Sequence, residues 1–264
     1  MIELAYIAPE MAEEFQDAVR FGAEAGARSL ALRSRIWGKD LEELSAADIG
    51  RMKDILSAYG ARVSAVYSGI GKCDIEDEGV VRSNVASWPS IAELAHAFDT
   101  ALVRVFPFQR PGVVEYEPSR LGQDLGLIVE RCTPLVRQAE SEGLVLCFEA
   151  VGSTLARTAR ELKQVVEALG KSPAVGIIWE IDVAWRAGES PTEGYQFARG
   201  ITRDVHVKPN AELPLAGDGD TYQTAFRSLL ADRYDGPATV EHWRGTENTV
   251  AALRELKGLL QQLQ

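Results

Sequence analysis

The histidine at position 206 lies in a short segment that could direct chemical groups to one side. If Asp204-Val205-His206-Val207-Lys208 is a strand, Asp204, His206 and Lys208 share one face while the two valines pack on the other. Of the three histidines in the chain, only His206 comes late in such a strand. An imidazole at that place is a candidate metal ligand.

Carboxylates occupy the matching place in three other apolar runs. Glu149 ends one run, Glu180 and Asp182 lie near the end of a second, and Glu241 follows a third. Carboxylates that converge without a cation repel one another strongly. Oxygen ligands with one imidazole suit Mn²⁺, Mg²⁺, Co²⁺ or Zn²⁺, and the lack of thiolates argues against a structural zinc. A surface position is the simpler interpretation of any single acid, but the set as a whole favours a divalent-metal site.

The composition narrows the class of protein. The chain has 264 residues, of which 46% are hydrophobic and 25% charged, as in an ordinary globular protein. Its net charge of −11 argues against a nucleic-acid partner. Three distant cysteines, no basic leader and no run of membrane-spanning length predict a cytoplasmic protein without membrane attachment.

Strand-like and helix-like segments alternate from end to end. The expected strands are 2–8, 28–33, 62–67, 102–106, 144–149, 174–182, 203–208 and 237–241. The expected helices are 12–25, 46–59, 83–98, 120–142 with a break or bend near Pro134, 157–169, 192–199, 221–231 and 247–263. Ser45 and Gly60 are suited to begin and end the second of these helices.

Eight strand–helix units without a composition break predict parallel strands joined by crossovers. In a chain of this length they favour one domain over residues 1–264, an α/β fold of the (β/α)8 TIM barrel type. An open doubly wound sheet is the alternative. It would show a glycine-rich phosphate turn after the first strand, which Pro9-Glu10-Met11 does not resemble.

Several short motifs, in their order and spacing, resemble a known family. They are Leu32-Arg33 with Trp37-Gly38-Lys39, Gly69-Ile70-Gly71-Lys72, Cys147-Phe148-Glu149, Arg186-Ala187-Gly188-Glu189-Ser190-Pro191, Val205-His206-Val207-Lys208, Gly217-Asp218-Gly219-Asp220, and Tyr234-Asp235-Gly236 running to Glu241-His242. Nearly end to end, the chain is similar to the xylose isomerase-like TIM barrels, the sugar phosphate isomerase/epimerase group.

The resemblance implies one divalent cation, Mn²⁺ first among the ions named above. The family holds it with a glutamate, an aspartate, a histidine and a second glutamate, and Glu149, His206 and Glu241 match three of these positions. The aspartate position departs from the family. An ungapped match places Glu180 there and a gapped match places Asp182 there; both have the same strand parity, and Glu180 is preferred.

The implied reaction is proton abstraction next to a carbonyl through a metal-stabilised enediolate. Glu149 and Glu241 would act as base and acid on the two faces of a sugar, sugar phosphate or cyclitol, in an isomerase or epimerase. A lyase or dehydratase acting on a keto-sugar, keto-cyclitol or oxidised glycoside is the alternative. Relatives are often dimers or tetramers, so a homo-oligomer is expected.

Other side chains near the same strand ends could bind substrate. Arg33, Lys72 and Lys208 are candidates for an oxyanion, carboxylate or phosphate, and Trp185 for stacking on a sugar ring. Trp37, Phe108 and Trp243 are further aromatic candidates, whereas His242 is expected to pack outward.

The same barrel could also serve two other functions. A DNA-repair endonuclease needs a histidine-rich cluster of several zinc ions, which three histidines and a charge of −11 do not supply. A non-catalytic sugar-binding barrel stays open because Glu180 and Val183 depart from the family pattern.

Overall fold

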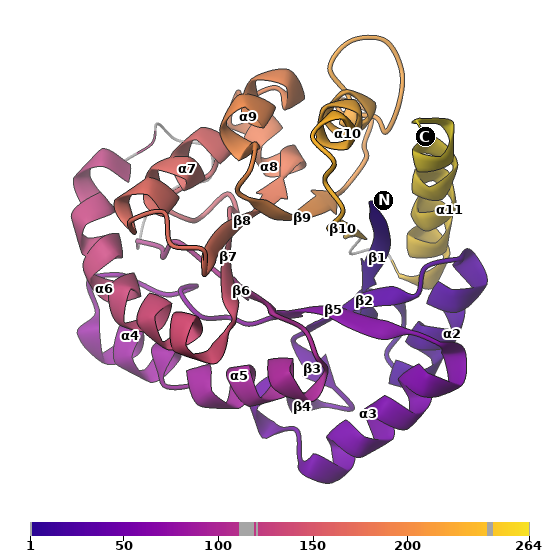
Figure 1. Cartoon of the computed structure of the whole chain (residues 1–264), viewed down its shortest axis with the longest axis horizontal. Helices are drawn as coiled ribbons and strands as arrows, with labels where there is room; N and C mark the ends of the chain where they lie inside the picture. The colour runs from indigo at the N-terminus through magenta and orange to yellow at the C-terminus, as the bar shows by residue number, and fades with distance from the viewer. Residues whose placement is uncertain (1, 111–118, 120, 242–244, 264) are drawn as a thin grey trace.

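The chain closes into a barrel of parallel strands surrounded by helices (Figure 1). The structure is a computed structural model that describes residues 2–110, 119, 121–241 and 245–263. Its barrel strands are β1 (Glu3–Ile7), β2 (Ser29–Arg33), β5 (Arg62–Tyr67), β6 (Leu102–Val105), β7 (Val145–Glu149), β8 (Val175–Glu180), β9 (Thr202–Val207) and β10 (Pro237–Val240). Around the barrel they follow the order β1-β10-β9-β8-β7-β6-β5-β2, which confirms the predicted (β/α)8 TIM barrel.

Helices connect these strands and cover the outside of the barrel (Figure 1). They are α1 (Ala8–Met11), α2 (Phe15–Ala25), α3 (Ala46–Tyr59), α4 (Glu78–Val85), α5 (Trp88–Ala97), α6 (Leu121–Glu142), α7 (Ala159–Ala168), α8 (Ile181–Arg186), α9 (Pro191–Ala198), α10 (Tyr222–Ala231) and α11 (Thr246–Leu263). As predicted, Ser45 caps α3 and Gly60 ends it in the left-handed conformation. Within the described ranges, every helix is too short or too polar to cross a membrane.

Two local expectations were wrong, and of the break or bend expected near Pro134 the break is absent. The segment 83–98 forms two helices, α4 and α5, because Pro89 has no N–H to continue the hydrogen bonding of the first helix. Pro134 lies inside α6, which runs unbroken from Leu121 to Glu142. The strand expected over 174–182 stops at Glu180, and α8 begins at Ile181. A small antiparallel hairpin, β3 (Arg35–Ile36) with β4 (Lys39–Asp40), was not predicted.

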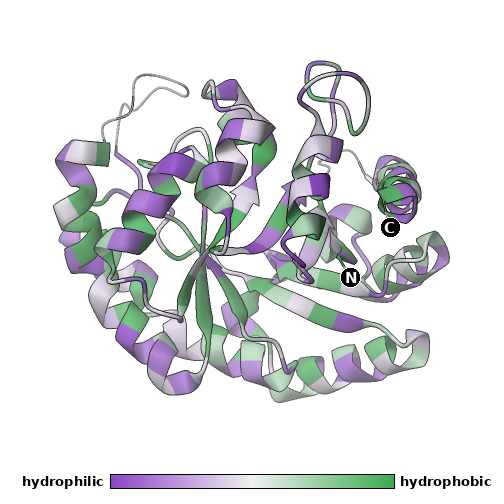
Figure 2. Ribbon diagram, turned by 45° about the horizontal axis from the view of Figure 1, so that its top comes forward, coloured by the Kyte–Doolittle hydropathy of each residue, from purple (hydrophilic) through white to green (hydrophobic). Residues whose placement is uncertain are grey.

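The core has two parts, separated by the barrel wall. The larger part packs the outer faces of the strands against the apolar faces of the helices, and Figure 2 shows hydrophilic residues gathered on the outer sides of those helices. The smaller part fills the barrel lumen with Ile7, Ala31, Ala65, Tyr67, Cys147 and Ile178, all at most 1% exposed. We call these six side chains the apolar plug. Each fully buried aliphatic side chain contributes about 1.5–3 kcal/mol to stability, so the plug stabilises the barrel beneath the carboxyl ends of the strands.

Candidate metal centre and active site

Four side chains from adjacent strands meet at the carboxyl end of the barrel. Glu149 ends β7, Glu180 ends β8, His206 lies in β9 and Glu241 follows β10. One potential ligand atom from each lies within 4.8 Å of those from the others, and all four residues are at most 3% exposed. The carboxyl end is where barrel enzymes carry their active sites. The structure therefore brings together four of the five residues predicted as metal ligands.

Two carboxylate oxygens point at the same nitrogen. His206 Nδ1 is 3.0 Å from Glu180 Oε2 and also 3.0 Å from Glu241 Oε2. Lys208 Nζ contacts the same two oxygens, at 3.2 and 2.9 Å. The other oxygen of Glu180, Oε1, is buried and has no hydrogen-bond partner among the described residues. A buried, unsatisfied carboxylate oxygen beside two more carboxylates and an imidazole is a donor set that fits a divalent cation.

The surrounding charges separate the proton affinities of the two neighbouring carboxyl groups. Burial raises the pKa of Glu180, although Lys208 and His206 oppose this effect. Burial also acts to raise the pKa of Glu241, but His206, Lys208 and Arg33 together hold it well below its usual value. Glu241 is therefore ionised at neutral pH, ready to bind a cation or accept a proton.

A buried hydrogen-bond chain orients the imidazole. Tyr67 donates its hydroxyl proton to Asp204 Oδ2 at 2.5 Å, so it accepts a hydrogen bond from His206 Nε2, which lies 2.9 Å away. Thr239 donates to the same carboxylate at 2.8 Å. Burial acts to lower the pKa of His206, but Glu241 and Glu180 together raise it well above its usual value, so Nδ1 also carries a proton that it shares with these two carboxylates. A cation bound to Nδ1 would take the place of that proton, while the Nε2–H bond to Tyr67 would keep the ring oriented. Asp204 shares the lumen face with His206, as the alternation predicts.

The remaining predicted ligand, Asp182, lies outside the group of four. It is in α8 rather than on the strand, so the expectation that it shares the strand parity of Glu180 was wrong. Its Oδ1 accepts a hydrogen bond from Asn210 Nδ2 at 2.8 Å, and its Oδ2 pairs with Arg186 at 3.2 Å. Because a helix begins at Ile181, the Asp182 carboxylate contacts Asn210 and Arg186 and does not join the four converging side chains.

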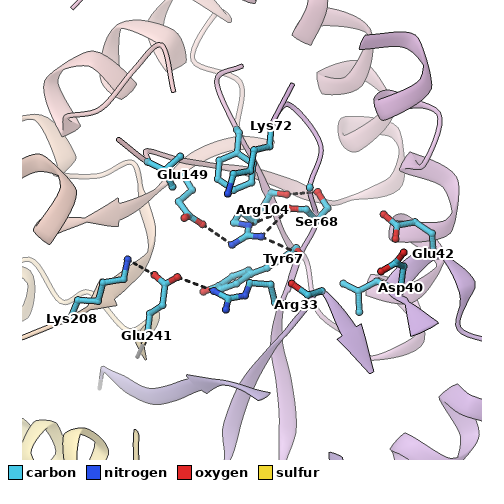
Figure 3. A pocket seen from close by; sticks show the side chains of 15 residues that line it. Arg33, Asp40, Glu42, Tyr67, Ser68, Lys72, Arg104, Glu149, Lys208 and Glu241 are labelled. Carbon is cyan, nitrogen blue, oxygen red and sulfur yellow. Dashed lines mark hydrogen bonds and ion pairs between the residues drawn. The ribbon is translucent and has the colours of Figure 1, made fainter. Parts of the chain in front are cut away.

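The predicted substrate-binding cations line one cavity of about 600 Å³, together with Glu149 and Glu241 of the four converging side chains (Figure 3). Arg33 pairs with Glu241 at 2.8 Å and also contacts Glu10. Lys208 bridges two glutamates, as described above, and Lys72 lies at the cavity wall.

Three of the predicted aromatic residues are described, and none of the three lines this cavity. Trp185 is a half-buried residue of α8 that packs against the outer core. Trp37 packs edge-on against Phe15, with ring centroids 5.9 Å apart. Phe108 is buried elsewhere, and the rings that do line the cavity are those of Tyr67 and Phe106. His242 and Trp243 fall outside the described residues.

Sequence reasoning missed two partners of the site. Arg104 in β6 is only 7% exposed, and its NH1 pairs with Glu149 Oε2 at 2.9 Å. Its Nε and NH2 donate to the carbonyl oxygen of Ser68, at 3.2 and 3.1 Å. Glu10, just after β1, is the second partner of Arg33. A charged residue inside the apolar segment Leu102–Val105 is a sequence signal that could have identified Arg104.

Comparisons with known proteins agree with the architecture. The chain superimposes on a D-tagatose 3-epimerase-like protein with a TM-score of 0.80 and 19% identity, covering 99% of this chain and 98% of that one. The probable 3-DHS dehydratase of petrobactin synthesis from Bacillus anthracis gives a TM-score of 0.75 at 16% identity, covering 98% and 99% of the two chains. A xylose isomerase-like TIM barrel protein from Mycobacterium smegmatis, in complex with magnesium, gives 0.75 at 18%, covering 99% and 96%. These identities establish the fold alone.

Sequence comparison gives the family directly. No curated protein sequence matches this chain. Residues 19–262 nevertheless match the family described as xylose isomerase-like TIM barrel, which is most of the chain. The match takes in β2 and every barrel strand after it, and so the strands that carry the four converging side chains. The chain belongs to the xylose isomerase-like TIM barrel family.

Proposed function

We propose that this protein is a divalent-metal-dependent isomerase or epimerase that moves a proton next to a carbonyl in a sugar, sugar phosphate or cyclitol. The observation that carries the proposal is the convergence of Glu149, Glu180, His206 and Glu241, two of which, Glu149 and Glu241, line a cavity of about 600 Å³. A cavity of that size has room for a small carbohydrate. Epimerases among the structural neighbours support the same chemistry.

The four converging residues would hold the ion, with Mn²⁺ as the first candidate. When bound, a divalent ion polarises vicinal substrate oxygens and makes the intervening C–H more acidic. The orphaned Glu180 oxygen and the shared orientation of two carboxylates toward His206 Nδ1 support this assignment of ligands.

Glu149 and Glu241 are the proposed acid–base pair, and the chain orients the two carboxyl groups in matching ways. Arg104 binds one oxygen of Glu149 at 2.9 Å, and Arg33 binds one oxygen of Glu241 at 2.8 Å. The second oxygen of Glu241 faces His206 and Lys208, at 3.0 and 2.9 Å, on the side where the ion would bind. Because the two glutamates come from β7 and β10, with two strands between them, they reach the cavity from different sides. One can remove a proton from one face of a carbon while the other delivers a proton to the opposite face.

The test is hydrogen exchange at carbon. Purified protein loaded with Mn²⁺ would be incubated in D₂O with a panel of ketoses and keto-cyclitols, and deuterium incorporation followed by NMR. The wild type should label the carbon next to the carbonyl in at least one substrate, and Glu149→Gln and Glu241→Gln should not. Asp182→Asn, a buried acid outside the cluster, is the matched control and should still label. Labelling that survives in both glutamine variants contradicts the assignment.

A lyase or dehydratase is the second candidate, favoured by the fold shared with a probable 3-DHS dehydratase. It would begin with the same proton abstraction and then lose a group β to the carbonyl. Lys208, which contacts Glu241 Oε2 at 2.9 Å, is positioned to assist departure of that group. The NMR assay separates the two functions, because elimination gives an unsaturated product whereas epimerisation gives a labelled isomer.

A further inference from the structure

Among the described residues, one of the cations that line the cavity has no carboxylate partner. Arg33 and Lys208 pair with Glu241, and Arg104 pairs with Glu149. Lys72 lines the same cavity, yet it forms no ion pair with any described carboxylate. Its ammonium group instead lies 5.2 Å from the centre of the Phe106 ring. A cation at a cavity wall without an internal partner is available to a ligand.

The loop that carries Lys72 is fixed in place. Ile70 is 1% exposed, and its carbonyl accepts a hydrogen bond from Phe106 N at 2.8 Å. Gly71 has φ +83°, and a Cβ there would lie 2.0 Å from Phe106 O, so only glycine fits. Lys72 N donates to Gly69 O at 3.0 Å, closing the turn. The backbone of Lys72 is therefore held at the cavity, so only its exposed side chain has to be ordered when a ligand binds.

The buried charges of the site balance without Lys72. Five buried carboxylates, those of Glu10, Glu149, Glu180, Asp204 and Glu241, would be matched by Arg33, Arg104, Lys208 and a divalent ion held with a neutral histidine. Lys72 is exposed at the cavity wall, so it keeps a positive charge that these carboxylates do not neutralise. A carboxylate of the substrate would match that single charge, whereas a phosphate, at about −1.5 to −2, would exceed it.

The charged side chains that line the cavity are also unevenly distributed. Figure 3 shows Lys72 beside Arg104 and Glu149, while Asp40 and Glu42 lie apart on the far side of Arg33. Asp40 pairs with Arg35 at 2.9 Å, and Glu42 is exposed, so solvent weakens the repulsion of both. Burial and the charge of Arg104 lower the pKa of Lys72, and a bound anion would oppose that effect.

We propose that the substrate carries a carboxylate that binds Lys72, so that the protein acts on acidic ketoses of the uronic-acid type in preference to neutral sugars. This inference rests on the proposed function for the ketose part of the substrate. The carboxylate site itself rests on the unpartnered Lys72 and the charge balance around it.

Three ketoses that differ only at C6 provide the test. D-fructose is neutral, D-fructuronate has a carboxylate and D-fructose 6-phosphate has a phosphate. Calorimetric titration of the Mn²⁺-loaded protein should show D-fructuronate binding at least tenfold more tightly than either of the others. Lys72→Met should abolish that advantage, and Lys72→Gln serves as a second variant if the first folds poorly. Lys171→Met, an exposed lysine preceding β8, is the matched control and should keep it.

The outcomes separate the two proposals. Equal binding of the three ketoses, binding of none, or tightest binding of the phosphate overturns the carboxylate inference, as does an unchanged preference in both Lys72 variants. Deuterium incorporation next to the carbonyl is followed in the same samples. If D-fructuronate binds through Lys72 but never exchanges, the carboxylate site stands and the isomerase assignment fails.

Discussion

The barrel lumen contains two layers of side chains, two positions apart along each strand. One layer is apolar and the other is charged. Ala31, Cys147 and Ile178 belong to the apolar plug and are at most 1% exposed. Two positions further along the same strands, on the same face, stand Arg33, Glu149 and Glu180, which are equally buried and carry charge. The lower layer stabilises the barrel by excluding water. The upper layer holds charges that balance only as a set, which is what a binding site for an ion and a substrate requires.

The largest expected effect on stability comes from breaking a pair in the upper layer. Arg104→Met leaves Glu149 as a buried carboxylate without its cation and should cost about 3–5 kcal/mol of unfolding free energy. Combining it with Glu149→Gln should be less destabilising than the sum of the single changes by roughly 0.5–3 kcal/mol. Urea unfolding of the four proteins measures both quantities. Strict additivity would mean that the two side chains do not interact.

The lower layer should respond differently. Ile178→Ala removes buried methyl groups beneath Glu180 and should cost about 2–5 kcal/mol, because the tightly packed plug collapses only in part. The folded variant should still bind Mn²⁺, since no charged group has changed. Urea unfolding and metal titration of the same preparation test this pair of results. If the variant lost metal binding but kept the stability of the wild type, the apolar layer would not have the purely structural role assigned to it.

Tyr67 contributes to both layers, with its ring in the apolar layer and its hydroxyl group in the charged layer. It lines the plug, yet its hydroxyl connects His206 Nε2 to Asp204. Tyr67→Phe keeps the packing and removes the hydrogen bonds, so Mn²⁺ affinity should fall roughly 10–100-fold. Competition with a chromophoric chelator measures that affinity. An unchanged affinity would show that His206 needs no help in presenting Nδ1.

The smallest effect is expected outside both layers. Ser45→Ala removes the hydroxyl that caps α3 on the outer ring and should cost about 1 kcal/mol. Metal affinity and substrate exchange should not change. Comparing its denaturation midpoint with that of the wild type calibrates the stability scale for the other variants. Altered metal binding would show that the outer helices and the metal site are coupled.

Sequence patterns were enough to predict the barrel and three strand-end residues of the site. Alternation in β9 marks His206, and the apolar runs before Glu149 and Glu241 mark the strand ends. The hydrophobic pattern could not decide whether Glu180 or Asp182 is the metal ligand. The residues after Glu180 are mostly apolar and suit a strand or a helix equally. Pairing of Glu180 with His206 in the sheet fixes the register, and only the fold reveals it.

Partners across the barrel were equally hidden. Arg104 and Glu149 are 45 positions apart, and Arg33 and Glu241 are 208 apart. Nothing local in the sequence says which buried cation meets which carboxylate, because that depends on the closure of β1 against β10 and on the side-chain directions at each strand end. The unpredicted hairpin β3–β4 is a short excursion of the β2 loop, with too few residues to show a strand pattern.

Metal titration tests the central claim most directly. Isothermal calorimetry of the metal-free wild type with Mn²⁺ should show one ion bound per chain. Glu180→Gln and His206→Asn should weaken that binding at least tenfold, while Asp182→Asn, two positions from Glu180, should leave it unchanged. A wild type that binds no divalent ion, or a Glu180→Gln variant that binds it as tightly as the wild type, would contradict the account.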